Sequence, residues 1–82
     1  MNTNVATIGF LKADRRRLRI LEALRSKANP QSISHKLRIS RPMVEKSINE
    51  LSERGLVKKE KDAYIATEEG LKILAQISRA GM

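Results

Sequence analysis

The sequence predicts a small, mostly helical domain with one β-hairpin, in the order helix, helix, helix, strand, strand, helix. Up to residue 54, apolar residues recur every three or four positions, which is typical of helices with one buried side. Between residues 56 and 66 the period shortens to two, as in strands, and helical spacing returns after residue 67. Residues 1–7 are polar and small without periodicity, and are predicted to form a flexible N-terminal arm before a domain at residues 8–82.

The first helix is predicted from its leucines. Three leucines at three-residue steps, ending at Leu24, form an apolar side. Asp14 is a candidate N-cap, but the three arginines that follow it would oppose the dipole of a helix that began there. We therefore expect a start near Thr7 or Ile8 and an end around Ser26.

Two short helices joined by a tight turn are predicted next. Asn29 is an N-cap residue type, and Pro30 suits the first position of a helix that runs to about Arg38. Ser40 is the expected N-cap of the third helix. Gly55 ends that helix, because glycine readily adopts the left-handed conformation of a C-cap.

The hairpin and the last helix complete the chain. Two short strands, at residues 56–59 and 64–66, flank a charged turn. Thr67 is the expected N-cap of the last helix, where Glu68 and Glu69 interact favourably with the helix dipole. With 82 residues the chain has room for one modest core, and a partner subunit would supply the burial that such a core lacks.

The charge balance favours a polyanionic partner. Lys and Arg number 17 against 9 Asp and Glu, which gives a net charge of +8 and a pI near 10.5. Nucleic acid and anionic membrane are the usual partners of such a domain, and solubility alone is the competing explanation. The sequence has no membrane-spanning stretch and no basic amphipathic helix ending in aromatics. The apolar stretch from Val5 to Leu11 is short and lacks a leading positive charge, so we do not expect it to be a secretory signal. We therefore expect a cytoplasmic protein without a membrane partner.

Several function classes are excluded by what the sequence lacks. One Phe, one Tyr and no Trp leave almost no platform for stacking single-stranded bases. Without cysteine and with His35 as the single histidine, disulfides and thiolate zinc sites are impossible, and no metal or cofactor is expected. There is no histidine–carboxylate cluster and no glycine-rich phosphate loop, so we do not expect an enzyme.

The centre of the chain carries a motif with a functional meaning. Two helices joined by a short turn, with a β-hairpin directly after the second, can place that helix in a DNA major groove with the hairpin beside it. The matching stretches are ISHKLRISRPMV at residues 33–44, LSERGLV at residues 51–57 and YIATEEG at residues 64–70. On these stretches the chain resembles winged helix-turn-helix repressors of the MarR, ArsR and PadR kind, over residues 15–79.

The resemblance implies a DNA-binding transcriptional regulator, and the sequence departs from it in three ways. Arg38 stands where the family often has glycine, so we expect a turn made without a residue that favours positive φ. The chain also lacks the added dimer helices of MarR-type proteins. Metal sensing of the ArsR kind looks unavailable without cysteine.

The third helix is expected to read bases. If Val44, Ile48 and Leu51 point inward, its opposite face presents side chains that suit base edges in the major groove. The alternative is an ordinary polar helix face. The predicted base-reading residues are Arg41, Pro42, Glu45, Lys46 and Asn49. Glu50 and Arg54, four residues apart, are instead predicted to pair with each other on the helix.

A second set of residues is expected to contact phosphates. The lysines of the hairpin would meet the DNA backbone or line the minor groove, although lysines also protect the edge of a small sheet. The predicted phosphate and wing residues are Ser32, Ser34, Lys36, Ser40, Lys58, Lys59 and Lys61. The basic run from Arg15 to Arg19 is either a phosphate clamp or a solvated face, and has no assigned role.

A homodimer is expected from the excess of apolar residues at both ends of the chain. The predicted interface residues are Ile8, Phe10, Leu11, Ile73 and Ile77. The alternative is that the N-terminal segment packs on the last helix of the same subunit. An isologous pair would also explain how such a protein reads a palindromic site in double-stranded DNA. A protein-interaction module and a non-specific architectural binder of nucleic acid are the competing functions.

Overall fold

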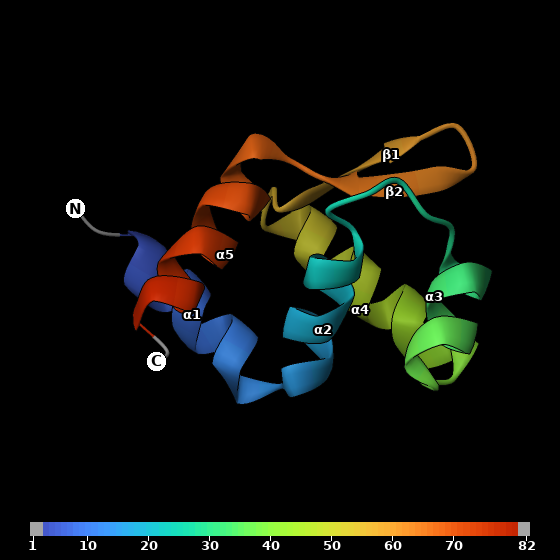
Figure 1. The fold of residues 1–82 in the computed structure, drawn as a ribbon, viewed down its shortest axis with the longest axis horizontal. Helices are drawn as coiled ribbons and strands as arrows, with labels where there is room; N and C mark the ends of the chain where they lie inside the picture. Colours follow the sequence, from blue (N-terminus) through green and yellow to red (C-terminus); the bar gives the residue numbers. More distant parts are fainter. Residues whose placement is uncertain (1–2, 81–82) are drawn as a thin grey trace.

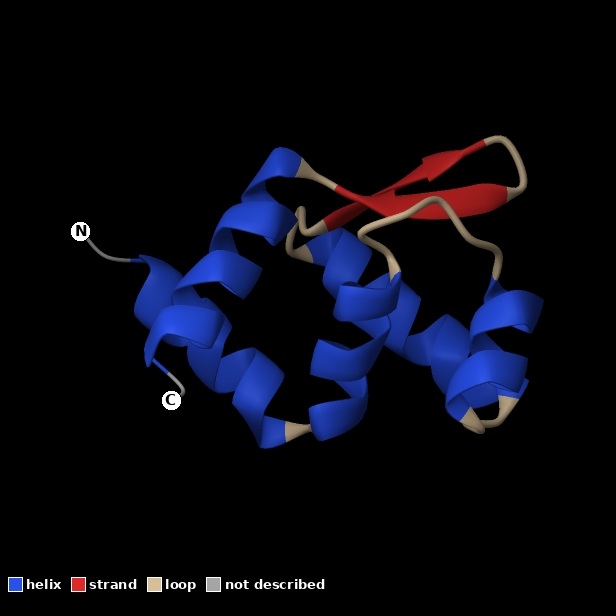
Figure 2. Cartoon of the chain, viewed as in Figure 1, coloured by secondary structure: helices blue, strands red, loops and turns tan. Residues whose placement is uncertain are grey.

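The predicted fold class is confirmed: the structure, a computed structural model, is mostly helical with one antiparallel hairpin. It describes residues 3–80 (Figure 1). In this part of the chain the elements are α1 (Thr3–Ala13), α2 (Arg15–Ala23), α3 (Pro30–Leu37), α4 (Arg41–Glu53), β1 (Val57–Glu60), β2 (Ala63–Ala66) and α5 (Glu68–Ala80). Figure 2 shows the helices as the body of the molecule, with the hairpin lying across them.

The N-terminal region differs from the prediction, because it holds two helices instead of one. Helix α1 begins at Thr3. The flexible arm predicted for residues 1–7 is therefore wrong for residues 3–7, while Met1 and Asn2 lie outside the described residues.

The break between α1 and α2 is made by an aspartate cap. The Asp14 side chain accepts a hydrogen bond from the backbone amide of Arg16 at 3.0 Å, which satisfies one of the amides that a helix start leaves without a partner. Its carboxylate also accepts from Nε of Arg16 at 3.2 Å and so offsets the cations of the first turn. The candidate start at Asp14 is thus used by α2, whereas the start expected near Thr7 or Ile8 is wrong, because α1 begins at Thr3.

One apolar cluster forms the core between the helices and the base of the hairpin. Helix α2 packs on α1, α3 and α4, and α5 packs on α1, α2 and β2. The buried residues of this cluster are Leu11, Ile20, Leu21, Leu24, Ile33, Ile39, Val44, Ile48, Leu51, Leu56, Val57, Ala66, Ile73 and Leu74. The inward stripe predicted for the third helix is therefore confirmed, and its opposite face is left to solvent.

The turn between α3 and α4 is left-handed at Arg38, which has φ 58°. The turn is made, as expected, without a residue that favours positive φ, and Arg38 itself adopts the left-handed conformation. A non-glycine residue rarely adopts this conformation, and neighbouring bonds hold it here. The hydroxyl of Ser34 donates to the Ile39 carbonyl at 2.6 Å, and the Ile39 amide donates to the Ser34 carbonyl at 3.2 Å. Asn29 caps α3 as predicted, whereas Ser40 precedes α4 without a capping hydrogen bond from its side chain.

The hairpin is held to the rest of the domain along β2. Val57 pairs with Ala66 and Glu60 pairs with Ala63, which leaves a two-residue turn. The segment between α2 and α3 bonds β2 at two places: Ala28 and Tyr64 exchange backbone hydrogen bonds of 3.0 and 2.8 Å, and the Ala66 amide donates to the Leu24 carbonyl at 2.7 Å. This third chain segment, not foreseen from the sequence, ties β2 to the helix-turn-helix.

Two predicted caps hold the segments that flank the hairpin. Gly55 has φ 75°, as expected of a left-handed C-cap. Oγ1 of Thr67 accepts from the Gly70 amide at 3.1 Å, and its hydroxyl donates to the Gly55 carbonyl at 2.7 Å. The end of α4 and the start of α5 therefore share one hydrogen-bonded corner.

The long axis of the molecule separates two different ends. Figure 1 shows α1 and α5 together at the end where both chain termini lie, and α3 at the opposite end with the tip of the hairpin. Helix α4 runs between these ends, behind α2 in this view. Its N-terminus therefore meets the α3 turn, and its C-terminus lies near α1.

Candidate nucleic-acid interface

The N-terminal part of α4 presents one solvent-exposed polar face. Val44, Ile48 and Leu51 are buried against the core. The residues on the opposite side are all exposed: Arg41, Pro42, Glu45, Lys46 and Asn49. The structure thus brings the five predicted base-reading residues together on one helix face, with side chains that reach outward.

Two of these residues already contact each other. Nε of Arg41 donates to Oε2 of Glu45 at 3.0 Å, across one helical turn. Their side chains are 55% and 50% exposed, so the pair remains open to solvent and to a ligand.

The predicted phosphate residues around α3 fall into two groups. Ser32, Lys36 and Ser40 are exposed, and Ser40 makes no capping bond with its side chain, so these positions are accessible. Ser34 is different, because its hydroxyl hydrogen is used on the Ile39 carbonyl inside the turn. Ser34 therefore shapes the turn and is not placed to donate to a phosphate, which corrects its predicted role.

The hairpin carries the other predicted cations. Lys58, Lys59 and Lys61 are all exposed, and Lys61 sits in the two-residue turn with φ 58°. Nζ of Lys58 lies 3.9 Å from the carboxylate of Glu60, and Nζ of Lys27 lies 3.9 Å from the same carboxylate. Lys27 was not foreseen as part of this surface, since tertiary hydrogen bonds, such as those between Ala28 and Tyr64, bring its loop to the hairpin.

The motif and its geometry agree with a comparison to known families. A family model described as winged helix-turn-helix matches residues 17–81. The chain belongs to the winged helix-turn-helix family. This is a family of DNA-binding domains, with α4 in the position of its recognition helix and the β1–β2 hairpin as its wing. The match does not extend to the MarR, ArsR or PadR subfamilies, which stay a resemblance. No curated protein matches the chain.

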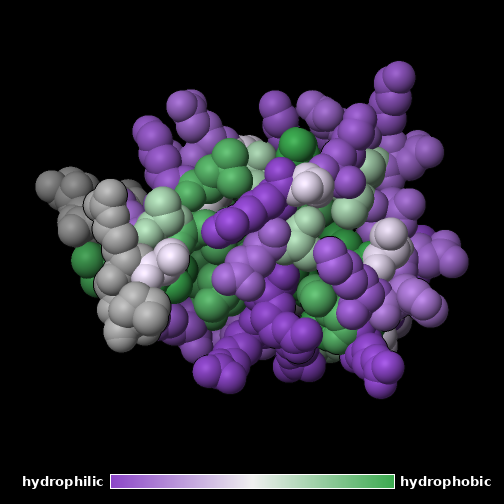
Figure 3. Space-filling model, in the orientation of Figure 1, coloured by the Kyte–Doolittle hydropathy of each residue, from purple (hydrophilic) through white to green (hydrophobic). Residues whose placement is uncertain are grey.

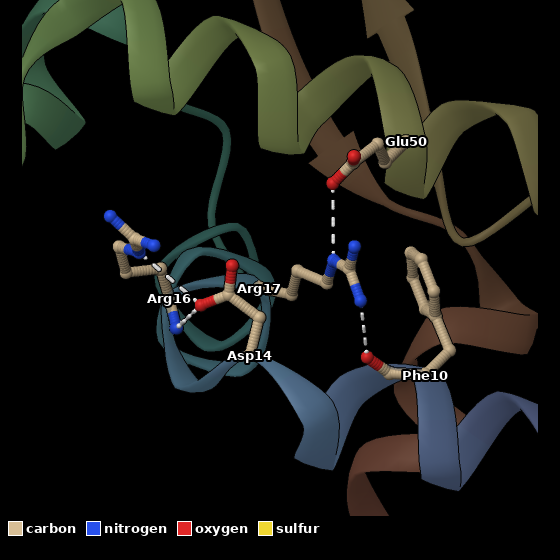
Figure 4. A network of polar contacts seen from close by, with 5 residues as sticks. All are labelled: Phe10, Asp14, Arg16, Arg17 and Glu50. Carbon is tan, nitrogen blue, oxygen red and sulfur yellow. Dashed lines mark hydrogen bonds and ion pairs between the residues drawn. The ribbon is translucent and has the colours of Figure 1, made fainter.

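Next to α4, Arg17 of the winged helix-turn-helix domain makes internal contacts with Glu50 and Phe10 (Figure 4). The Arg17 guanidinium donates from Nε to Glu50 Oε1 at 3.1 Å and from Nη1 to the Phe10 carbonyl at 2.8 Å. It also lies 4.1 Å from the centre of the Phe10 ring, and the Arg54 guanidinium lies 4.0 Å from the same centre. We call Phe10, Arg17, Glu50 and Arg54 the junction cluster.

The junction cluster corrects one prediction and answers an open question. The predicted pair of Glu50 and Arg54 is wrong, because Glu50 binds Arg17 while Arg54 stacks on Phe10. The basic run after Asp14 is also not uniform. Arg17 is half-buried in the cluster, whereas Arg15 and Arg19 are exposed.

The predicted dimer residues are only partly available on the surface of the winged helix. Leu11 and Ile73 are fully buried in the core of the same subunit, so their assignment to a subunit interface is wrong. Phe10 is half-buried under the junction arginines, and Ile8 and Ile77 are half-buried at the edge of the core. The packing of α1 on α5, weighed as the alternative, explains these positions.

Two exposed apolar residues that the sequence analysis did not select lie on the same two helices. Val5 on α1 is 66% exposed and Leu71 on α5 is 44% exposed. Figure 3 shows hydrophilic side chains around the α3 end and the hairpin, with hydrophobic ones gathered over the middle and toward α1 and α5. The winged helix thus has a polar end and a more apolar end.

Two other kinds of feature are absent from the described part of the chain. Residues 3–80 contain no group of three His, Cys, Asp or Glu side chains that could hold a metal ion. None of the described helices is long and apolar enough to cross a membrane.

Proposed function

We propose that this protein is a sequence-specific regulator of transcription that binds double-stranded DNA, with α4 in the major groove. The observation that carries the proposal is the exposed face of α4. Arg41 and Lys46 suit guanine, and Asn49 suits adenine, at the end of the helix that a winged helix-turn-helix turns toward DNA. The other side of the same helix is buried, so only this face is open to a ligand.

Phosphate contacts would supply most of the affinity. Lys59 and Lys61 on the wing, and Lys36 with Ser40 beside the turn, are exposed at the end of the molecule that holds α3 and the hairpin tip. A net charge of +8 on a small domain supports association that weakens steeply with salt. These contacts fix the orientation of the protein, and α4 adds the preference among sequences.

The proposed assembly is a homodimer through α1 and α5. Val5 and Leu71 are exposed, and Ile8 and Ile77 are partly so, on two helices that pack together. Two copies related by a two-fold axis would address half-sites about one helical turn of DNA apart. Sedimentation equilibrium of the wild type and of a Val5→Ser, Leu71→Ser variant tests this, and a monomeric wild type at all concentrations would contradict it.

The first experiment is a fluorescence-anisotropy titration of the protein's own promoter duplex against a scrambled duplex, at low and moderate salt. We expect the promoter to bind about 10³-fold more tightly. The variant Arg41→Ala, Lys46→Ala should lose this preference. A matched control, Lys12→Ala with Lys72→Ala, removes two exposed cations from α1 and α5 and should keep it.

The same titration separates the competing functions. Equal binding of both duplexes with a steep salt slope would indicate an architectural binder. No binding to either duplex at low salt would reject the DNA-binding proposal and leave a protein-interaction module.

A further inference from the structure

The contact between Arg41 and Glu45 is poorly placed to stabilise its own helix. Arg41 is the first residue of α4, where a cation opposes the helix dipole, and the first turn has no acidic residue. The pair also has the less favourable orientation, with the cation four residues before the anion. Both side chains are about half exposed, so the pair gains little from burial.

Glu45 is also unusual in its charge environment. Between Glu22 and Glu50 it is the only acidic residue, in a stretch that otherwise carries arginines and lysines. A carboxylate on a surface that approaches DNA is repelled by phosphates and lowers non-specific affinity. The presence of Glu45 on this surface is therefore better explained by a contact with a particular base than by a contribution to non-specific affinity.

The hydrogen bond within the pair leaves a defined set of groups for a base pair. Arg41 uses Nε on Glu45, so the two terminal nitrogens of its guanidinium remain to donate. This end of the fork matches the O6 and N7 acceptors of guanine. Glu45 uses Oε2, and its other oxygen can accept from the N4 amino group of cytosine.

We propose that Arg41 and Glu45 act as one unit that reads a G·C base pair in the major groove. The inference rests on the proposed function and assigns a specificity role to Glu45. The contact with Glu45 holds the Arg41 guanidinium in one orientation, which reduces the side-chain entropy lost on binding guanine. Glu45 in turn disfavours a thymine carbonyl at the cytosine position, because two acceptors would then face each other.

The test starts by selecting duplexes from a pool with a randomised 20-base-pair segment. Every base pair of the selected site is then replaced singly, and affinities are measured by anisotropy for the wild type and three variants. Glu45→Gln keeps the shape of the side chain and removes its charge, while Arg41→Lys keeps a cation and removes the fork. Glu53→Gln is the matched control, since it removes an exposed carboxylate from the C-terminal end of the same helix.

The expected result is one position at which the wild type prefers G·C over A·T by about tenfold or more. At that position alone, Glu45→Gln and Arg41→Lys should bring the preference below about threefold, whereas Glu53→Gln should keep it. Circular-dichroism melting curves should be nearly the same for all four proteins, because the substituted side chains are exposed.

Two failures are distinguishable. If the wild type selects a defined site but Glu45→Gln leaves every base preference unchanged, or Glu53→Gln has the same effect, the paired reading is overturned and the regulator remains. If no duplex is selected over the starting pool, sequence-specific binding itself fails, and the inference fails with it.

Discussion

The cations at the two ends of α4 are used in opposite ways. At its C-terminal end, Arg17 and Arg54 lie against Phe10, and Arg17 binds both Glu50 and a backbone carbonyl. The Arg17 side chain is 20% exposed. At its N-terminal end, Arg41 is 55% exposed and reaches outward with Lys46. One end is closed by internal contacts, and the other is open to a ligand.

This difference shows that net charge alone does not locate a binding surface. Arg17 belongs to the densest basic run of the sequence, yet its hydrogen bonds and ring contact join α1, α2 and α4. The cations that remain exposed at the α3 end are spread more widely along the sequence, from Lys36 to Lys61. The Arg41–Glu45 contact at this end is about half exposed, so it contributes little to stability and leaves both side chains open to a ligand.

The close packing near the C-terminal end of α4 should not tolerate added volume. Of all the substitutions, Gly70→Ala is expected to have the largest effect on stability. A Cβ at Gly70 would overlap the carbonyl oxygen of Leu56 and lie 3.3 Å from Cδ1 of Leu21. That carbonyl cannot move freely, because it accepts from the Thr67 amide at 2.9 Å. We expect a loss of about 3 kcal/mol in the free energy of unfolding, measured by urea titration.

Gly9→Ala is the control for this prediction. A Cβ at Gly9 meets nothing within 4 Å, and the residue lies inside α1. Alanine is the better helix former, so this variant should gain about 0.5–1 kcal/mol. Equal effects of the two substitutions would show that close packing of α5 against Leu56 and Leu21 does not matter.

Two substitutions with effects of intermediate size should distinguish the internally bonded cations from the exposed ones. Arg17→Leu keeps an apolar stem but leaves Glu50 and the Phe10 carbonyl without their partner, and should cost about 2 kcal/mol of stability. Lys59→Ala should leave stability unchanged and reduce the salt dependence of DNA binding by about one phosphate contact. Urea titration measures the stability of both variants, and anisotropy measures the salt dependence of their DNA binding.

If Arg17→Leu and Lys59→Ala changed the same quantity, either stability or the salt dependence of DNA binding, the distinction between the two kinds of cation would be wrong. Arg19→Leu provides the control for the Arg17 position, since Arg19 is exposed on the same helix. Its stability should stay within about 0.5 kcal/mol of the wild type.

The smallest expected effect is a pH dependence at the start of α2. The hydrogen bond from the Arg16 amide, and then that from its side chain, lower the pKa of Asp14 below its ordinary value of 3.8. A lowered pKa in the folded state means that Asp14 stabilises the fold above its unfolded pKa and loses this contribution as the pH falls through the folded value. Asp14→Ala should cost about 1 kcal/mol at pH 7, as cap removal does.

The pH dependence is tested with Asp14→Asn, which retains a capping oxygen without the ionisable group. Its stability should change less than that of the wild type between pH 5 and pH 3, as measured by urea titration at each pH. An unchanged acid profile would show that the Asp14 carboxylate does not contribute through its charge.

The features predicted correctly from the sequence are those with local causes. The Asn29 cap, the left-handed Gly55 and the Thr67 cap each depend on contacts within a few residues. The errors have non-local causes or competing local ones. The three arginines after Asp14 argue against a helix start there, because cations oppose the helix dipole. The Asp14 carboxylate offsets this unfavourable interaction, and α2 begins at this point.

By itself, the sequence determined the order of helices and strands from α3 onward and the polar face of α4, because periodicity and caps act along one segment. Only the tertiary structure decided which arginines stay exposed. Folding α1 back onto α5 buried Leu11 and Ile73 and brought Phe10 between Arg17 and Arg54. These contacts join residues far apart in the chain, and their energies depend on which apolar faces meet. Local patterns do not carry that information.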